Sequence, residues 1–350
     1  MQVSDINRPR YDSFWTDLNN ELRELESRSG LAAVLEALQV QQRDIGFIQD
    51  DLNALKRYRF HHPEDDSRFF CVQYNPRRAQ RFAGAGRTTA PPGTAAINDG
   101  CFLCRDNIRW QQRGIELGYE IDIGGSKYVA WMNAFPMMPV HAVIATKAHV
   151  PQAWSLGEED GMGFTIDRLL RELVALADRL PGFIGFYNGQ GAGASNLGHF
   201  HLQFFKRPED YGLFPLEAAA RDPRHLLPDY PVAVVCWQGQ SQDVVDQACQ
   251  WMAEWVEANN GGPMSISANI FAVADDENGP MRLYFVPRDQ MRSHSPEMAG
   301  AVGGLEILGE LVFSEAEEKG RLDRGEVDYR TVEHILASVN VACDLHASNP

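Results

Sequence analysis

The sequence is poor in cysteine, in long apolar runs and in positive charge. Six cysteines in 350 residues are too few for a disulfide-dense secreted domain. No apolar run approaches the ~18 residues that a membrane-spanning helix needs, and the start, MQVSDINRPRYDSF, lacks the apolar segment of a signal peptide. With 32 Lys and Arg against 48 Asp and Glu, the formal charge of −16 argues against non-specific binding to nucleic acid or to an anionic membrane. We therefore expect a cytoplasmic protein with neither of these partners.

The order of helix-like and strand-like segments predicts an α+β protein, an antiparallel sheet with packed helices. Residues 11 to about 60 carry apolar side chains at helical spacing, which predicts an N-terminal helical segment over 1–65. Strand-like runs and amphipathic helices then follow twice in a similar order, in 66–228 and in 229–350. This order suggests two related α/β halves, although no repeat is visible residue by residue.

Single elements are predicted from the period of their apolar residues and from their boundaries. We expect a long Gly/Pro-rich loop over AGAGRTTAPPGTAAINDG and a hairpin that turns at Asn278-Gly279. Strands are predicted in RFFCVQY, KYVAWMNAF, HAVIATKAHV, GFIGFYNGQ and YPVAVVCWQ, and helices in EEDGMGFTIDRLLRELVALADRL, SQDVVDQACQWMAEWVEANN and YRTVEHILASVNVACDL.

The stretch NLGHFHLQFF places polar residues at alternate positions inside an apolar run. On a strand, His199, His201 and Gln203 share one face, and the apolar residues between them share the other. A half-exposed strand explains such alternation, but Lys, Thr or Glu would serve there as well as imidazole and amide. The preceding NGQGAGASN, which includes Gly193, allows a backbone to approach an anion closely. Together the two features suggest a phosphate held against a nucleophile.

A Cys-x-x-Cys pair, Cys101 and Cys104, lies in NDGCFLCRDN. It has the spacing of half a tetrahedral zinc site, and because the chain offers no second Cys pair, histidines must complete such a site. A redox pair and a chemically inert pair are the alternatives. Four histidines lie in apolar segments that suit a ligand or a nucleophile: His141, His149, His199 and His201.

These motifs resemble one branch of the histidine-triad superfamily. HFHLQ is similar to the His-x-His-x-Gln variant found in galactose-1-phosphate uridylyltransferase, diadenosine tetraphosphate phosphorylase and the GDP-hexose phosphorylases. Further stretches fall in the order of that branch, and the resemblance covers about residues 70–210, with a weaker similarity to the phosphorylases in ANIFAVADDENGPMRLYFVPRDQMR. The ordered stretches are QYNPRRAQR, CFLC, NAFPMMPVHAVIATKAHVPQ and FYNGQGAGASNLGHFHLQ. A bacterial group within the branch shares the Cys-Phe-Leu-Cys and Phe-Tyr-Asn-Gly motifs.

The resemblance implies a fold and a set of residue roles. The fold would be HIT-like and GalT-like, and a structural Zn²⁺ would be held by Cys101, Cys104, His149 and His199. His201 would be the nucleophile and Gln203 would hydrogen-bond the transferred phosphoryl group.

Further residues are implied to bind the substrate. Asn188 has the spacing of the nucleotide-loop Asn. The phosphate-binding Ser of the branch lies three residues before the first His, whereas Ser195 lies four before His199, so either Ser195 or Asn196 takes that role. Candidate substrate-binding residues are Asn75, Arg77, Asn188, Gly193, Ser195, Asn196 and Arg288.

The function that the resemblance implies is that of a nucleotidyltransferase or phosphorylase. It would act on a nucleoside-diphosphate sugar or a dinucleoside polyphosphate through a nucleotidyl-His201 intermediate, with inorganic phosphate or a sugar phosphate as acceptor. A nucleotide hydrolase is the alternative, which Gln203 disfavours because hydrolases of the superfamily usually carry His there. A non-enzymatic, zinc-stabilised nucleotide-binding protein is a third reading. Because members of the superfamily often dimerise, a homodimer is a possible assembly.

Overall fold

The structure is a computed structural model of the 350-residue chain. It describes residues 3–48, 52–83, 96–108, 116–156, 164–220, 230–258, 266–276 and 279–341. Most of the predicted long loop over 83–100, and Asn278 at the tip of the predicted hairpin, lie outside the described residues.

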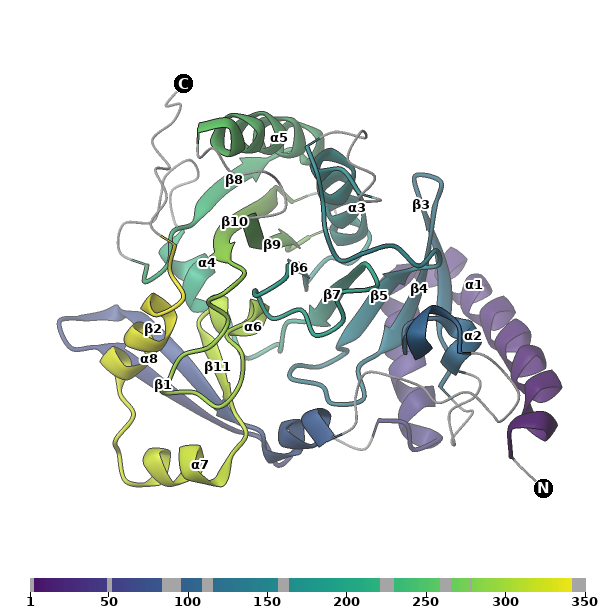
Figure 1. The fold of residues 1–350 in the computed structure, drawn as a ribbon, viewed down its shortest axis with the longest axis horizontal. Coiled ribbons are helices and arrows are strands. Elements are labelled where there is room, and N and C mark those ends of the chain that lie inside the picture. Colours follow the sequence, from purple (N-terminus) through teal and green to yellow (C-terminus); the bar gives the residue numbers. More distant parts are fainter. Residues whose placement is uncertain are drawn as a thin grey trace.

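One antiparallel sheet of eight strands is the centre of the fold, in the order β3-β4-β5-β7-β6-β9-β10-β8 (Figure 1). All of the strands predicted in this part of the chain are present. In sheet order they are β3 (Tyr119–Ile123), β4 (Ser126–Met132), β5 (Ala142–Thr146), β7 (His201–Lys206), β6 (Phe183–Asn188), β9 (Ile266–Ala274), β10 (Met281–Asp289) and β8 (Val235–Gly239). Since β6 pairs with β9, segments from both predicted halves build a single sheet.

Each face of the sheet packs against its own hydrophobic core, as alternation along the strands requires. On β7 and the residue before it, Phe200, Leu202 and Phe204 are fully buried in one core, and Phe205 lies in the other. Burial of such a side chain stabilises the fold by roughly 2–3 kcal/mol. The first core is covered by α1 (Val3–Asp44), α3 (Ile166–Asp178) and α5 (Ser241–Ala258); the second by α4 (Pro215–Ala219), α6 (Gly304–Ile307) and α8 (Tyr329–Ala337).

A small second sheet lies beside the second core, in the order β1-β2-β11 (Figure 1). It consists of β1 (Lys56–His62), β2 (Asp65–Tyr74) and β11 (Glu310–Phe313), and β11 runs parallel to β2. The prediction of helix to about residue 60 was therefore wrong at its end, because α1 ends at Asp44. The alternating Tyr58 and Phe60 instead pair with the apolar strand β2 and pack on the second core.

The N-terminal helix α1 runs along the other end of the large sheet. It contains one non-helical residue, Gly30, at φ 79°. Asn19 occupies the exposed edge of β3: its Nδ2 donates to Gly118 O at 2.9 Å, and its Oδ1 accepts from Glu120 N at 2.8 Å. The side-chain amide thus replaces a neighbouring strand and protects the edge.

The remaining described helices are short. They are the 3₁₀ turns η1 (Pro76–Ala83) and η2 (Asn98–Gly100), and the helices α2 (Arg105–Ile108) and α7 (Ala316–Asp323). None of the helices in the described part of the chain combines the length and the apolar composition that crossing a lipid bilayer requires.

The large sheet contains an approximate two-fold axis. Gln203 of β7 faces Phe186 of β6, and Tyr284 of β10 faces Phe271 of β9. Phe186 and Phe271 are themselves partners across β6 and β9. An axis close to this pair relates β5-β7-β6 to β8-β10-β9, with α3 preceding β6 and α5 preceding β9. The domain limits at 65 and 228 stay predictions.

Candidate functional site

Two cysteines and two histidines from three distant segments converge at one end of β5 and β7. Cys101 and Cys104 come from the turn after η2, His149 follows β5, and His199 precedes β7. One donor atom from each residue lies within 4.8 Å of the other three. His199 Nδ1 lies 3.4 Å from Cys101 Sγ and 3.3 Å from His149 Nδ1, and His149 Nδ1 lies 3.4 Å from Cys104 Sγ. The structure therefore brings all four predicted ligands together.

The spacing of these atoms fits a tetrahedral metal ion. A zinc with ordinary Zn–S and Zn–N bond lengths would separate its ligand atoms by about 3.3 to 3.8 Å. His199 Nε2 lies 2.6 Å from the carbonyl oxygen of Thr146, which can only accept, so the proton is on Nε2 and the lone pair of Nδ1 faces the cysteines. The cluster could hold a metal ion.

The two sulfurs receive hydrogen bonds from amides. Asn196 Nδ2 donates to Cys101 Sγ at 3.2 Å, and Asn98 Nδ2 donates to Cys104 Sγ at 3.4 Å. Hydrogen bonds from the Cys104 thiol and from Asn196 lower the pKa of Cys101 well below its usual range, and the proton shared with Cys101 raises the pKa of Cys104. At Cys101 this environment favours the thiolate that a metal ligand must supply.

The turn that carries the cysteines explains the sequence NDG before them. Asn98, Asp99 and Gly100 have φ values of 49°, 53° and 74°, in the left-handed region that these three residue types tolerate best. Behind the turn, Arg105 lies 4.4 Å from the ring centre of Trp15 and binds Asp12, both on α1. The N-terminal helix therefore supports the cysteine turn.

His201 begins β7 and is held through its backbone and its ring. Its backbone N–H donates to Gln152 Oε1 at 2.7 Å, and Gln152 Nε2 donates to the carbonyl oxygens of His201 and Asn188. The ring Nδ1 lies 2.8 Å from the carbonyl oxygen of His199. Because a carbonyl only accepts, Nδ1 carries the proton of the neutral ring and Nε2 carries the lone pair.

Gln203 lies two residues further along β7 and is half-buried. Its Oε1 is 3.0 Å from Nε2 of His141, which is 1% exposed. Alternation along the strand puts the Gln203 side chain on the same face as His201.

The predicted nucleotide loop packs against the second half of the chain. Gly193 has φ +97°, and a Cβ there would lie 2.5 Å from Gly303 Cα and 3.2 Å from Asn188 Nδ2. Asn188 Oδ1 accepts from Asn269 Nδ2 at 2.8 Å. The carboxamide of Asn188 therefore points its Nδ2 toward the backbone of this loop.

Arg288 holds Asn269 in turn. Its Nη1 donates to Asn269 Oδ1 and its Nη2 to Val302 O at 2.8 Å. The side chain is 2% exposed, and burial lowers the pKa of its guanidinium to about 10, so it remains a cation at neutral pH. Arg288, predicted to bind substrate, is thus engaged with protein groups and orients the amides of Asn269 and Asn188.

The other predicted residues are distributed around this centre. Asn75 is buried and donates to Pro136 O at 3.2 Å, in the turn that leads to His141. Arg77 is exposed at the start of η1. The side chain of Asn196 contacts Cys101, whereas Ser195 lies beside it in the loop.

Three buried residues of this site were not assigned a role from the sequence. Gln152 clamps β7 to β6, His141 contacts Gln203, and Asn269 contacts Asn188. His141 was among the four candidate histidines, so its residue type gave a signal. Gln152 and Asn269 gave none, because a single amide beside a strand is typical of any half-buried segment.

Comparison with known proteins gives a partial match to one family model and a shared fold. Residues 37–206, just under half of the chain, match a family model described as a domain of unknown function (DUF4922). No curated protein matches the sequence.

Solved structures share the fold. Yeast Ap4A phosphorylase Apa2 in complex with Ap4A has a TM-score of 0.55 at 16% identity, covering 87% of this chain and 95% of that chain. The same enzyme with AMP gives 0.54 at 18% identity, over 87% and 96%. An ADP-glucose phosphorylase from Arabidopsis thaliana with bound ADP-glucose gives 0.35 at 14% identity, over 82% and 100%, too low for an argument. The chain is therefore similar in fold to Ap4A phosphorylase, and the predicted HIT-like, GalT-like α+β fold is confirmed.

Proposed function

We propose that the protein is a nucleotidyltransferase of the phosphorylase type, acting on a dinucleoside polyphosphate or a nucleoside-diphosphate sugar. The observation that carries this proposal is the tautomer of His201, whose Nδ1–H donates to His199 O at 2.8 Å and leaves the lone pair on Nε2. An imidazole held in this way is a nucleophile suited to phosphorus. The fold shared with yeast Ap4A phosphorylase supports the substrate class.

In the first step, Nε2 of His201 would attack the α-phosphorus of the nucleotide. A P–N bond forms, the bond from phosphorus to the bridging oxygen breaks, and the departing group takes the electron pair; this group is a nucleoside polyphosphate from a dinucleoside polyphosphate or a sugar phosphate from a nucleoside-diphosphate sugar. The positive charge of the phosphorylated ring is stabilised by the hydrogen bond from Nδ1 to His199 O. In the second step an acceptor oxygen attacks the same phosphorus and returns the electron pair to Nε2.

Positioning of the reacting groups and stabilisation of their charge account for most of the rate enhancement in phosphoryl transfer. Gln203, on the same face as His201, would hydrogen-bond the transferred phosphoryl group. Asn188, Gly193 and Ser195 would line the nucleotide, and Asn75 and Arg77 are proposed to reach its other phosphates. Asn196 would serve the cysteine cluster, since it bonds Cys101, which leaves Ser195 as the phosphate contact.

The four-residue cluster would hold a structural Zn²⁺. Two thiolates and two imidazoles are the donor set that zinc prefers, and four protein ligands complete a tetrahedron without a position for substrate. When bound, the metal would fix the cysteine turn and the start of β7. His199 would be one of its ligands, and its carbonyl oxygen also orients the ring of His201. This one residue would therefore connect the metal site directly to the nucleophile.

Inorganic phosphate is the proposed acceptor, with a sugar phosphate as the variant for a transferase. A hydrolase with water as acceptor is the alternative, and it differs in one measurable way: its turnover does not depend on added phosphate.

The test uses Ap4A and ADP-glucose, each radiolabelled at the α-phosphorus and incubated with purified protein. We expect an acid-labile, base-stable label on the protein that disappears in His201→Ala. His61→Ala, at an exposed histidine outside the site, is the matched control and should label like wild type. Turnover that requires phosphate identifies phosphorolysis; turnover without it identifies hydrolysis. Wild-type protein that binds these nucleotides but never labels or turns over supports a non-enzymatic binding protein instead.

A further inference from the structure

The segment before β5 contains a strained residue. Val140 has φ +50°, in the left-handed region that a β-branched residue almost never adopts, and it is 4% exposed. Such strain persists only where the surroundings hold it, and it clusters at sites where it fixes a geometry. Val140 immediately precedes His141, which contacts Gln203 on the proposed catalytic strand.

The strained residue is held from the N-terminal helix. The backbone N–H of Val140 donates to Gln39 Oε1 of α1 at 2.7 Å. On either side, Lys206 N donates to Pro139 O and Asn133 N donates to His141 O, both at 2.8 Å. These three bonds tie the segment to α1, to the end of β7 and to β4.

The hydrogen bonds of His141 determine its tautomer. The backbone N–H of Met137 points at Nδ1 from 3.3 Å, and since an N–H only donates, Nδ1 is an acceptor. In the neutral ring the proton is therefore on Nε2, which donates to Gln203 Oε1 at 3.0 Å. With its oxygen held by His141, the carboxamide of Gln203 is oriented with its NH₂ group away from His141.

We propose that Gln39 and His141 are positioning residues for the transfer reaction: together they orient Gln203 so that it offers a donor, not an acceptor, to the transferred phosphoryl group. This inference rests on the proposed function. It gives the N-terminal helix a role at the site, since without the Gln39 acceptor the strained turn at Val140 loses a contact that holds it. A phosphoryl group carries only acceptor oxygens, so the NH₂ end of Gln203 is the useful end.

The test compares two substitutions at each position in the full-length enzyme, with Ap4A and inorganic phosphate as substrates. Gln39→Leu removes the acceptor, whereas Gln39→Glu keeps an oxygen there. His141→Leu removes the donor, whereas His141→Gln keeps an amide donor of similar reach. Gln250→Leu, at a glutamine on the exposed face of α5, is the matched control for Gln39→Leu.

We expect Gln39→Leu to lower kcat about tenfold and His141→Leu about a hundredfold, with KM changed less than about threefold, because the contact would strengthen in the transition state. Gln39→Glu and His141→Gln should recover most of the loss. Unfolding by urea, run on the same samples, shows whether each variant is folded. Equal kcat in Gln39→Leu and Gln39→Glu, or in His141→Leu and His141→Gln, with wild type active, overturns the positioning role and leaves the proposed function intact.

A second readout does not depend on activity. In protein labelled with ¹⁵N-histidine, NMR reports which ring nitrogen of His141 carries the proton. We expect an Nε2–H tautomer whose proton exchanges faster with solvent in Gln203→Leu. A proton on Nδ1 overturns the inference. If wild type turns over no nucleotide while this tautomer is present, the proposed function fails, whereas the hydrogen bond by which His141 orients Gln203 is upheld.

Discussion

The strands β5-β7-β6 and β8-β10-β9 share one backbone arrangement but carry different side chains. His201 pairs with Ala145, the fourth residue of β5, and Arg282 pairs with Gln238, the fourth residue of β8. By the same register, Gln203 corresponds to Tyr284. Where the first half presents imidazole and amide, the second presents guanidinium and phenol.

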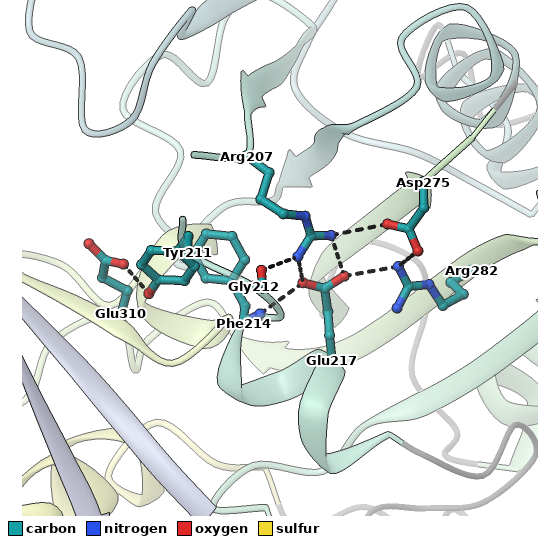
Figure 2. Close-up of polar contacts among 8 residues, drawn as sticks. All are labelled: Arg207, Tyr211, Gly212, Phe214, Glu217, Asp275, Arg282 and Glu310. Atoms are coloured by element: carbon teal, nitrogen blue, oxygen red, sulfur yellow. Dashed lines mark hydrogen bonds and ion pairs between the residues drawn. The ribbon is translucent and has the colours of Figure 1, made fainter. Parts of the chain in front are cut away.

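At the second location the guanidinium of Arg282 is paired with acidic side chains (Figure 2), whereas the buried hydroxyl of Tyr284 has no hydrogen-bond partner among the described residues. Arg207, at the end of β7, binds Glu217 through two bonds of 2.6 and 2.8 Å and reaches Asp275 at 3.3 Å. Arg282 bonds the same two carboxylates. The Glu217 side chain has no exposed surface, and its Oε2 also accepts from Phe214 N at 3.0 Å. We call these four residues, Arg207, Glu217, Asp275 and Arg282, the ion-pair cluster.

The register also reveals the repeat that the sequence alone hides. The segment HLQFFKR aligns with RLYFVPR, so Leu202, Phe204 and Arg207 correspond to Leu283, Phe285 and Arg288. Arg207 reaches Asp275, just after β9, and Arg288 reaches Gly191, in the loop after β6, at 3.4 Å. Each half thus sends one arginine to the hairpin of the other. The comparison teaches that one backbone arrangement carries imidazole and amide groups at one location and, at the corresponding location, a guanidinium that neighbouring carboxylates neutralise.

The largest difference between the halves should come from the cluster of Cys101, Cys104, His149 and His199, which has no counterpart among the described residues of the second half. Cys104→Ser is expected to remove about one equivalent of metal and to lower the free energy of unfolding by on the order of 5 kcal/mol or more, because binding to a structural zinc site is coupled to folding. Metal analysis and urea unfolding measure both. Cys249→Ser, outside the cluster, is the control. Wild type that contains no metal and is as stable as Cys104→Ser contradicts this expectation.

Substitutions at the corresponding positions of β7 and β10 test the comparison directly. His201→Asn should lower turnover at least roughly 10³-fold with little change in stability, because it removes the nucleophile. Arg282→Gln, at the corresponding position of β10, should leave turnover per folded molecule unchanged and lower stability by about 1–3 kcal/mol, because it leaves Glu217 with one cation fewer. The comparison breaks down if Arg282→Gln reduces kcat as His201→Asn does.

The ion-pair cluster should be sensitive to loss of its buried carboxylate. Glu217→Gln is expected to lower the free energy of unfolding by about 3 kcal/mol, since two arginines then lack their buried partner. Urea unfolding provides the measurement, and Glu254→Gln on α5 is a matched surface control. A change below about 1 kcal/mol, typical of exposed ion pairs, would falsify the view that this cluster stabilises the fold.

An effect of opposite sign is expected at the buried carboxyl of Glu116, for which the described residues supply no ion-pair partner. Burial raises the pKa of Glu116 from 4.5 to about 8, and among the described residues no nearby charge contributes to this shift. The folded state therefore holds a proton that the unfolded state loses above its pKa, so stability falls as pH rises from about 4.5 to about 8.

Glu116→Gln should abolish that dependence and stabilise the protein by about 4 kcal/mol at pH 8, as measured by urea unfolding across this pH range. Glu21→Gln, at an exposed position on α1, serves as the control. A wild type whose stability rises with pH over this interval contradicts the expectation.

Much of this architecture could be predicted because local pattern and local structure agree. The alternation in NLGHFHLQFF gave both faces of β7, and the four converging ligands followed from a motif order that the resemblance supplied. The strand β1 could not be predicted, since Lys56–His62 becomes a strand only by pairing with β2. The burial of Arg288 and its bond to Asn269 could not be predicted, because a sequence does not show which side chains surround a cation; its role in substrate binding stays a prediction.

The sequence by itself determined which chemistry is available: two thiols, the imidazoles and a glutamine at alternate positions, and small residues before them. Those choices are local, because residue type and spacing alone decide them. Only the tertiary structure decided which nitrogen of His201 and of His141 carries the proton, and which end of Gln203 and Asn188 is a donor. The ends of Gln203 and Asn188 are set by His141 and Asn269, which lie 62 and 81 residues away in the chain. The partners of the two rings, at His199 and Met137, are near in the chain but point at the ring nitrogens only in the folded backbone, because a hydrogen bond has a direction that its partner fixes.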